Sequence, residues 1–179
     1  KLEMYINFIY LKDKHIPMED VVKLQLIHQS RVEDLKEITS YLSLSETFKS
    51  EYTTPLKNGE LRLSQKGKDL LAAIQIPGLH DNDLKLADFL IAKYSSEDKI
   101  ICSKNKAAKL IAWFRAEANL THEELSRLIQ HYLNSPDGEY NKKLEYLFFK
   151  PENAYEKPNL GSSRLYLYLE KLRNEKVEQ

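Results

Sequence analysis

The sequence predicts a mainly α-helical protein with one β-hairpin, divided into two small domains. Most of the chain repeats apolar residues at intervals of three or four, which is the spacing of an amphipathic helix. The run Lys57-Asn58-Gly59-Glu60 lies between two short segments of strand-forming residues, and Asn-Gly in such a place is typical of a hairpin turn. Residues 76–82, IPGLHDN, show no periodicity and contain Pro, Gly and Asn. They are therefore expected to link a first domain, 1–75, to a second, 83–179.

The composition is that of a globular protein and not of a chain dominated by one charge. Of the 179 residues, 42% are hydrophobic and 30% are charged, so the chain can bury a core. The 27 Lys and Arg residues balance the 27 Asp and Glu residues, which argues against a basic protein that coats nucleic acid but leaves room for a local basic patch. The single cysteine, Cys102, excludes an internal disulfide and suits a reducing compartment, so a cytoplasmic location is expected. No apolar run approaches the roughly 20 residues of a membrane-spanning helix, and no membrane partner is expected.

The first domain is predicted to contain three helices, a hairpin and a fourth helix. Ser30 is expected to cap the third helix, whose inward stripe would start at Val32. The hairpin would carry a type I′ turn at Asn58-Gly59. The expected elements are helices over 2–14, 17–29 and 30–42, a hairpin over 48–63, and a helix over 64–74 capped by Ser64.

This order of elements resembles a winged-helix domain over residues 2–75. Families with that fold often end the wing in an L-[ST]-x-x-G-x-x-L-L string, and residues 63–71 match it, with Gly67 allowing the following helix to pack closely. The resemblance implies DNA contact through a recognition helix, expected over residues 31–42, and through the hairpin as the wing. It equally admits a protein-docking module, since winged helices also serve that role.

Charge favours the wing over the expected recognition helix as the DNA-contacting part. The helix over 31–42 carries three acids and two cations, a poor fit to a phosphate-lined groove. Residues 49–68 carry five cations and two acids. Lys57, Arg62 and Lys66 are therefore predicted to contact nucleic acid.

The second domain is predicted to be all helical. Thr121 and Glu124 form a capping box that marks the start of a helix reaching about residue 133. Residues 134–161 are expected to be irregular and aromatic, before a last helix. A winged helix followed by Trp113-Phe114-Arg115 and the segments 125–132 and 145–149 resembles phage and bacterial replication-initiation or helicase-loading proteins of the DnaD-like type. The resemblance implies a bacteriophage or mobile-element setting and a role in replication or transcription regulation.

The sharpest charge feature lies over residues 99–115, which hold five cations and no acid. On a helix, Lys106, Lys109 and Trp113 follow i, i+3, i+7 and share a face. Such a stripe can hold a phosphate backbone and stack a base, so all three are predicted to bind nucleic acid. The alternative is a solvated lysine face beside a Trp that covers a neighbouring helix. The aromatic residues of 140–155 pose the same choice between a stacking surface and loop packing.

No arrangement typical of a catalytic or metal centre is found in the sequence. The five histidines lack the spacing of a zinc site, and Cys102 has no identifiable base. Neither a P-loop string nor GxGxxG occurs, so no cofactor is expected. We therefore expect a non-enzymatic DNA-associated accessory protein, with duplex or single-stranded DNA and a protein as partners. The alternatives are an adaptor that binds protein alone, and an enzyme whose site the sequence does not reveal.

Overall fold

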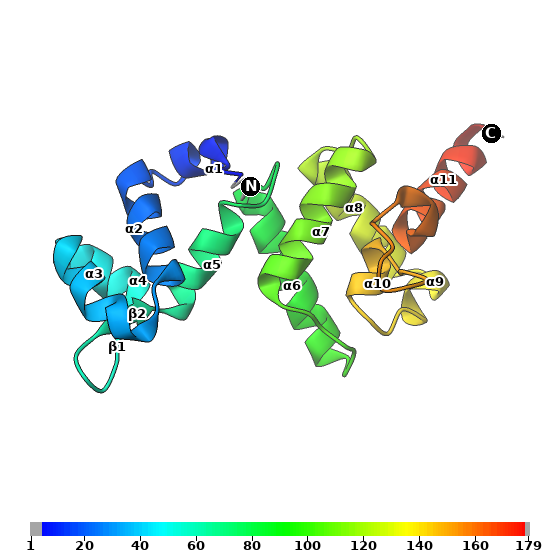
Figure 1. Cartoon of the computed structure of the whole chain (residues 1–179). Helices are drawn as coiled ribbons and strands as arrows, with labels where there is room; N and C mark the ends of the chain where they lie inside the picture. Colours follow the sequence, from blue (N-terminus) through cyan, green and yellow to red (C-terminus); the bar gives the residue numbers. More distant parts are fainter. Residues whose placement is uncertain (1–4, 178–179) are drawn as a thin grey trace. The chain divides into compact units, whose positions relative to one another are not determined.

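The computed structural model describes residues 5–177, and the chain divides into two compact units, Lys1–Pro77 and Gly78–Gln179 (Figure 1). The prediction of a mainly α-helical chain with one hairpin is confirmed. The boundary falls inside the expected linker, which is shorter than expected. Ile76 and Leu79 are buried, and residues 81 and 82 already belong to the first helix of the second unit.

The first unit surrounds a core built on its second helix. The elements are α1 (Phe8–Asp13), α2 (Met18–Gln29), the 3₁₀ turn η1 (Val32–Asp34), α3 (Leu35–Tyr41), α4 (Glu46–Tyr52), β1 (Thr53–Pro55), β2 (Leu61–Leu63) and α5 (Gln65–Ala73). Val21, Leu24 and Ile27 of α2 are buried. Residues from the other elements that close this core are Leu35, Phe48, Leu63, Leu71 and Ile74.

Asn7 joins the start of this unit to its end. Its backbone N–H donates to the Ile74 carbonyl at 2.7 Å, and its side-chain amide donates to the Ile76 carbonyl at 3.2 Å. Its side-chain oxygen accepts the Tyr10 N–H at 3.0 Å and so caps α1. The helix expected over 2–14 therefore begins at Phe8, while residues 2–4 lie outside the described part.

The helix expected over 30–42 is not formed as one piece. Ser30 ends α2 instead of starting the next helix, because its hydroxyl donates back to the Leu26 carbonyl at 2.5 Å. Val32, expected to face inward, is exposed in η1. Regular helix starts only at Leu35.

Residues 48–52, expected to form a strand, belong to α4. The Ser45 hydroxyl accepts the Phe48 N–H at 3.1 Å and caps this helix. Phe48 is buried, and its ring meets that of Tyr52 one turn later, edge to face at 5.3 Å. The cap and this i, i+4 contact outweigh the strand preference of aromatic residues.

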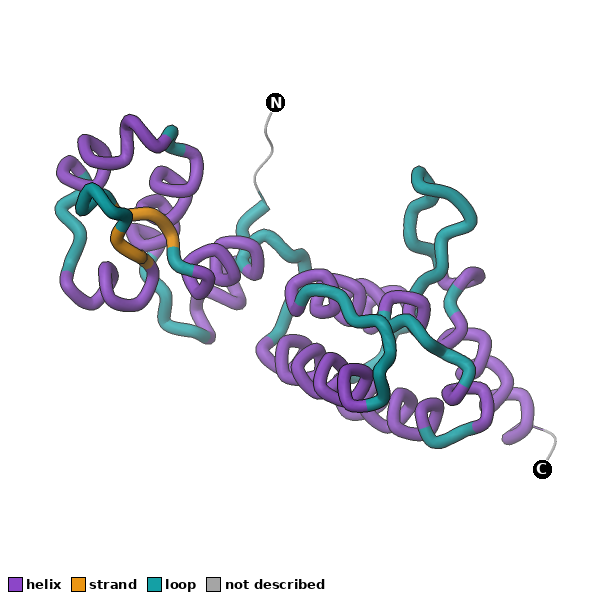
Figure 2. The backbone as a smooth tube through the Cα atoms, turned by 90° about the horizontal axis from the view of Figure 1, so that it is seen from below, coloured by secondary structure: helices purple, strands orange, loops and turns teal. Residues whose placement is uncertain are grey.

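The hairpin has two short strands (Figure 2), and it turns at the expected place with a different turn type. Thr53 pairs with Leu63 and Pro55 with Leu61 in antiparallel register. The Leu56 N–H donates to the Glu60 carbonyl at 2.6 Å, and the Gly59 N–H donates to the Leu56 carbonyl at 2.9 Å. Gly59 has φ +79°, whereas Asn58 is not among the residues with positive φ. The loop is thus a three-residue turn with one left-handed glycine, and the type I′ prediction was wrong.

Gly67 holds α5 against the end of α4, as the sequence suggested. The Ser64 hydroxyl accepts the Gly67 N–H at 3.2 Å and caps α5. A Cβ added at Gly67 would lie 2.5 Å from the Tyr52 carbonyl oxygen. Only a residue without a side chain allows this approach.

The second unit is a helical assembly in which α6 and α7 pack along each other and α11 packs on α8 and α10. Its elements are α6 (Asp81–Ser96), α7 (Lys104–Glu117), α8 (His122–Leu133), α9 (Pro136–Glu139), α10 (Glu145–Phe148), the 3₁₀ turn η2 (Leu160–Ser162) and α11 (Arg164–Val177). The predicted capping box is confirmed, because Thr121 and Glu124 exchange backbone-to-side-chain hydrogen bonds of 2.8 and 3.2 Å. The segment expected to be irregular contains two single-turn helices, α9 and α10.

Replacing Gly67 with Ala should lower the free energy of unfolding of the first unit by about 1–3 kcal/mol, the usual cost of overpacking. The new methyl group would press on the Tyr52 carbonyl, which accepts the Ser64 N–H at 2.8 Å. Urea unfolding followed by circular dichroism measures the change. Lys68→Ala, on the exposed face of the same helix, is the control. Equal stability of the two variants would contradict the close approach at Gly67.

Candidate nucleic-acid interface

A four-residue turn joins the two short helices α3 and α4. The turn covers residues 42–45 and reverses direction at Ser43, which has φ +48°. Two helices joined by a turn of this length follow the pattern of a helix-turn-helix motif. The hairpin follows directly after α4. Residues 31–42, expected to be the recognition helix, contain η1 and α3, and α4 is the helix that directly precedes the hairpin.

The outer face of α4 is polar and close to neutral. Thr47 and Ser50 are exposed, and their hydroxyls are on short side chains that can reach a partner. The Lys49 ammonium lies 3.0 Å from the Glu46 carboxylate, so the charges of these two residues offset each other. Any sequence reading by α4 would therefore depend on hydroxyls and on Glu46 more than on positive charge.

The three cations predicted on the hairpin and at the start of α5 differ in whether they form an ion pair. Lys57 in the turn and Arg62 on β2 are exposed and form no ion pair with the residues that the structure describes. Lys66 is engaged, because its ammonium lies 3.3 Å from the Glu51 carboxylate and 5.6 Å from the centre of the Tyr52 ring. Of the three predicted cations, Lys57 and Arg62 are thus free of ion pairs within the described residues, and Lys66 is held against α4.

The predicted stripe on α7 lies beside α10 and the residue after it. The Lys106 ammonium sits 2.7 Å from the Glu145 carboxylate, and this hydrogen bond raises the pKa of Lys106. Trp113 is half-buried, with its ring edge-on to Phe149 at 6.4 Å. Lys109 alone of the three is exposed without an ion pair among residues 5–177. Two of the three side chains therefore have a partner within the unit.

Some aromatic side chains of residues 140–155 are buried and others are exposed. Phe148 and Phe149 are buried in the core of the unit. Tyr146 lies beneath two ammonium groups, 4.6 Å from that of Lys143 and 5.8 Å from that of Lys150. Tyr140 is 77% exposed and so remains available for a stacking contact.

A buried carboxylate, which in the sequence resembles an ordinary helix-start acid, organises the second unit. Asp83 is fully buried, and each of its oxygens meets two donors. One oxygen lies 3.2 Å from Arg115 Nε and 3.3 Å from His122 Nδ1. The other lies 3.1 Å from Arg115 Nη2 and accepts the His80 backbone N–H at 2.9 Å. We call these four residues the Asp83 clasp.

The Asp83 clasp ties three helix ends together. Asp83 is in the first turn of α6, Arg115 in the last turn of α7, and His122 at the start of α8. A further Arg115 contact, 2.7 Å from Nη2 to the Gly78 carbonyl, extends the network to the first residue of the unit. Because the carboxylate oxygens are fully occupied, the arrangement is that of a structural ion pair and offers no free base for catalysis.

Burial has the largest effect on the pKa of His122. It lowers the pKa of His122, and Arg115 and His80 act in the same direction against the opposing charge of Asp83. The His80 ring lies edge-on to His122 at 5.0 Å, so a charge on one would be felt by the other. The clasp therefore favours the neutral form of His122.

The described residues offer little for metal or covalent chemistry. Within residues 5–177, no group of three His, Cys, Asp or Glu side chains is placed to hold a metal ion. Burial, followed by the charge of Glu145, raises the pKa of Cys102 and keeps the thiol protonated, which makes it a weak nucleophile. None of the helices in the described part is long and apolar enough to cross a membrane.

Asp83→Ala should lower the free energy of unfolding of the second unit by about 3–5 kcal/mol, the cost of leaving a buried partner charge unpaired. The matched control is Asp88→Ala on the same helix, whose pair with Lys104 is largely exposed. That change should cost about 1 kcal/mol or less. Urea unfolding of the full chain measures both. Similar losses of stability in the two variants would contradict the clasp.

The stability of the second unit should fall as the pH drops below the ordinary His range. Because the folded pKa of His122 is lower than its unfolded value, the unfolded chain takes up the proton first and gains from it. The destabilisation begins near the unfolded value of about 6.5 and continues down to the folded pKa. His122→Gln should flatten this part of the pH dependence in thermal unfolding between pH 7 and 5. An unchanged slope in that variant would assign the effect to another group.

Comparison of the chain with protein-family models, with curated proteins and with solved structures finds no match. The geometry of each unit is therefore the basis for assigning a function.

Proposed function

We propose that this chain is a non-enzymatic DNA-binding accessory protein that contacts duplex DNA through α4 and the hairpin. One observation carries the proposal: a helix-turn-helix runs directly into a hairpin whose two exposed cations, Lys57 and Arg62, form no ion pair within the described residues. Exposed cations beside a helix that can enter the major groove are the minimum such contact requires.

The two parts would have different roles on the duplex. Lys57 and Arg62 would contact phosphates, which fixes the position of the protein without reading sequence. Thr47 and Ser50 would face the base edges. The Thr47 hydroxyl can donate or accept a hydrogen bond there, the Ser50 hydroxyl can accept one because it donates to the Thr47 carbonyl, and Glu46 can accept one from a cytosine amino group. Lys66 supports the interface by holding Tyr52 and Glu51 in place.

The setting we propose is cytoplasmic DNA replication or transcription. The likeness of the first half to winged-helix domains and of the second half to DnaD-like initiation and helicase-loading proteins supports it, and it includes a bacteriophage or mobile-element origin. The second unit would then dock to a protein or to single-stranded DNA. Lys109 is the residue of the α7 stripe that remains accessible for this, since Lys106 and Trp113 are engaged.

A second candidate, a protein adaptor, is favoured by an exposed apolar face on the first unit. Met18, Val22 and Leu26 recur every fourth residue on α2 and are exposed, although the opposite side of α2 is buried. Phe8 and Ile9 of α1 are also exposed, at 64% and 65%. Apolar side chains gathered on a helix face in this way are typical of protein-binding surfaces.

Replacing both Lys57 and Arg62 by Ala should weaken duplex binding and lower its dependence on salt. Each phosphate that the protein no longer neutralises reduces the slope of log affinity against log salt by about 0.9. Fluorescence anisotropy of a labelled duplex measures the affinity and its salt dependence. The salt concentration is varied from roughly 50 to 200 mM, the range over which phosphate contacts change the affinity strongly. The fold should be unchanged, because both side chains are exposed.

The control removes the same charge elsewhere. Lys106→Ala together with Lys109→Ala should leave duplex affinity close to that of the original chain. If the α7 pair weakens duplex binding and the hairpin pair does not, the interface is wrongly placed. Absence of duplex binding at low salt would leave the adaptor as the function.

A further inference from the structure

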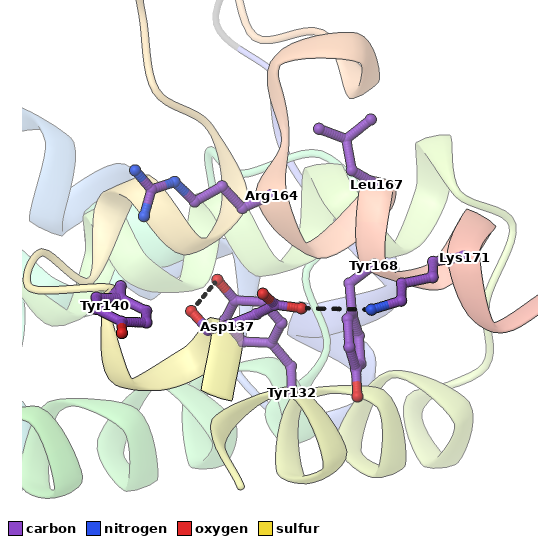
Figure 3. A pocket seen from close by; sticks show the side chains of 7 residues that line it. All are labelled: Tyr132, Asp137, Tyr140, Arg164, Leu167, Tyr168 and Lys171. Carbon is purple, nitrogen blue, oxygen red and sulfur yellow. Dashed lines mark hydrogen bonds and ion pairs between the residues drawn. The ribbon is translucent and has the colours of Figure 1, made fainter. Parts of the chain in front are cut away.

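An open groove in the second unit combines tyrosine rings with positive charge (Figure 3). It runs between the end of α8 with α9 on one side and the first two turns of α11 on the other. Tyr132, Tyr140 and Tyr168 supply its aromatic walls, and Arg164 and Lys171 its cations. The Lys171 ammonium faces the Asp137 carboxylate at 4.0 Å, so Arg164 carries the uncompensated charge of the groove.

Arg164 occupies a position where a cation is unfavourable unless it meets an anion. It is the first residue of α11, whose start is marked by Ser163, with a hydroxyl that accepts the Tyr166 N–H at 3.2 Å. The first turn of α11 contains no acid, and Arg164 forms no ion pair with any described residue. The helix dipole and the guanidinium therefore place positive potential at the same spot, which is the chemistry of a phosphate site.

The groove is suited to a chain more than to a compact ion. Tyr140 is 77% exposed and lies at the Arg164 end of the groove, where a flat ring can stack on it (Figure 3). Beyond Arg164 a second hollow continues, lined by Lys150, Ser162 and Glu152. Arg164 thus lies between two hollows, one of which also contains Lys171 and the other Lys150.

We propose that this groove binds single-stranded nucleic acid, with a phosphate on Arg164 and a base stacked on Tyr140. The inference rests on the proposed function only for the class of partner, and it places the single-strand contact on α11 and α9 instead of on the α7 stripe. Asp137 would repel a phosphate at the far end and can accept a hydrogen bond from a base amino group.

The test is fluorescence anisotropy of the full chain with a labelled oligothymidylate at low salt. Tyr140→Ala should weaken binding about 5- to 150-fold, the worth of one stacked base. Arg164→Ala should lower the slope of log affinity against log salt by about 0.7, the value for one phosphate on a single strand. Tyr140→Phe should restore most of the affinity because it keeps the ring. Unchanged thermal unfolding shows that the folded unit is intact, since both side chains are exposed.

Matched controls separate this site from the others. Tyr41→Ala removes a similarly exposed tyrosine from the first unit and should leave single-strand binding unchanged. Lys109→Ala removes a free cation from α7, and if it weakens binding while Arg164→Ala does not, the groove is overturned. Binding of the wild-type chain that a mononucleotide or inorganic phosphate displaces as well as the oligonucleotide does would overturn a strand as the ligand. Lys57→Ala with Arg62→Ala should leave single-strand binding unchanged. This double variant therefore tests the duplex interface separately from the groove.

Discussion

The buried carboxylate of Asp83 is the constraint on which the second unit depends. A carboxylate without water needs donors for both oxygens, and here four donors arrive from His80, Arg115 and His122. Those donors sit at one end of α6, at the end of α7 and at the start of α8. Satisfying the charge therefore fixes where three helices meet, and the rest of the unit is built on that frame.

In the first unit the corresponding constraint is steric. α5 approaches the end of α4 so closely that the Tyr52 carbonyl occupies the place of a side chain at Gly67. Because the hairpin connects these two helices, the close approach also sets where the hairpin leaves the unit. The orientation of Lys57 and Arg62 thus follows from a missing side chain elsewhere in the chain. A charged surface of this kind is positioned by packing and not by its own interactions.

Local ion pairing separates the cations of this neutral chain into those already used and those available to a partner. Lys66 and Lys106 each face a carboxylate within the same unit, and the pair is part of how their helices pack. Lys57, Arg62, Lys109 and Arg164 are exposed without such a partner in the described residues. A net charge of zero therefore conceals several separate places of positive potential. The exposed apolar face of α2 is a further surface of different chemistry, suited to protein and not to phosphate.

The sequence by itself determined the fold class, the place of the hairpin turn, and the helix starts at Ser64 and Thr121. Each of these depends on residues close together in the chain, such as a cap with its amide three residues later. Only the tertiary structure decided that residues 48–52 are helical, because the Phe48–Tyr52 contact and burial outweigh strand preference. It also decided which lysines are free, that Asp83 meets Arg115, and that Tyr140 and Arg164 border one groove. Lys66 and Glu51 lie 15 positions apart in the chain, and Asp83 and Arg115 lie 32 apart. A local pattern carries no information about such contacts, since they arise from the packing of whole helices.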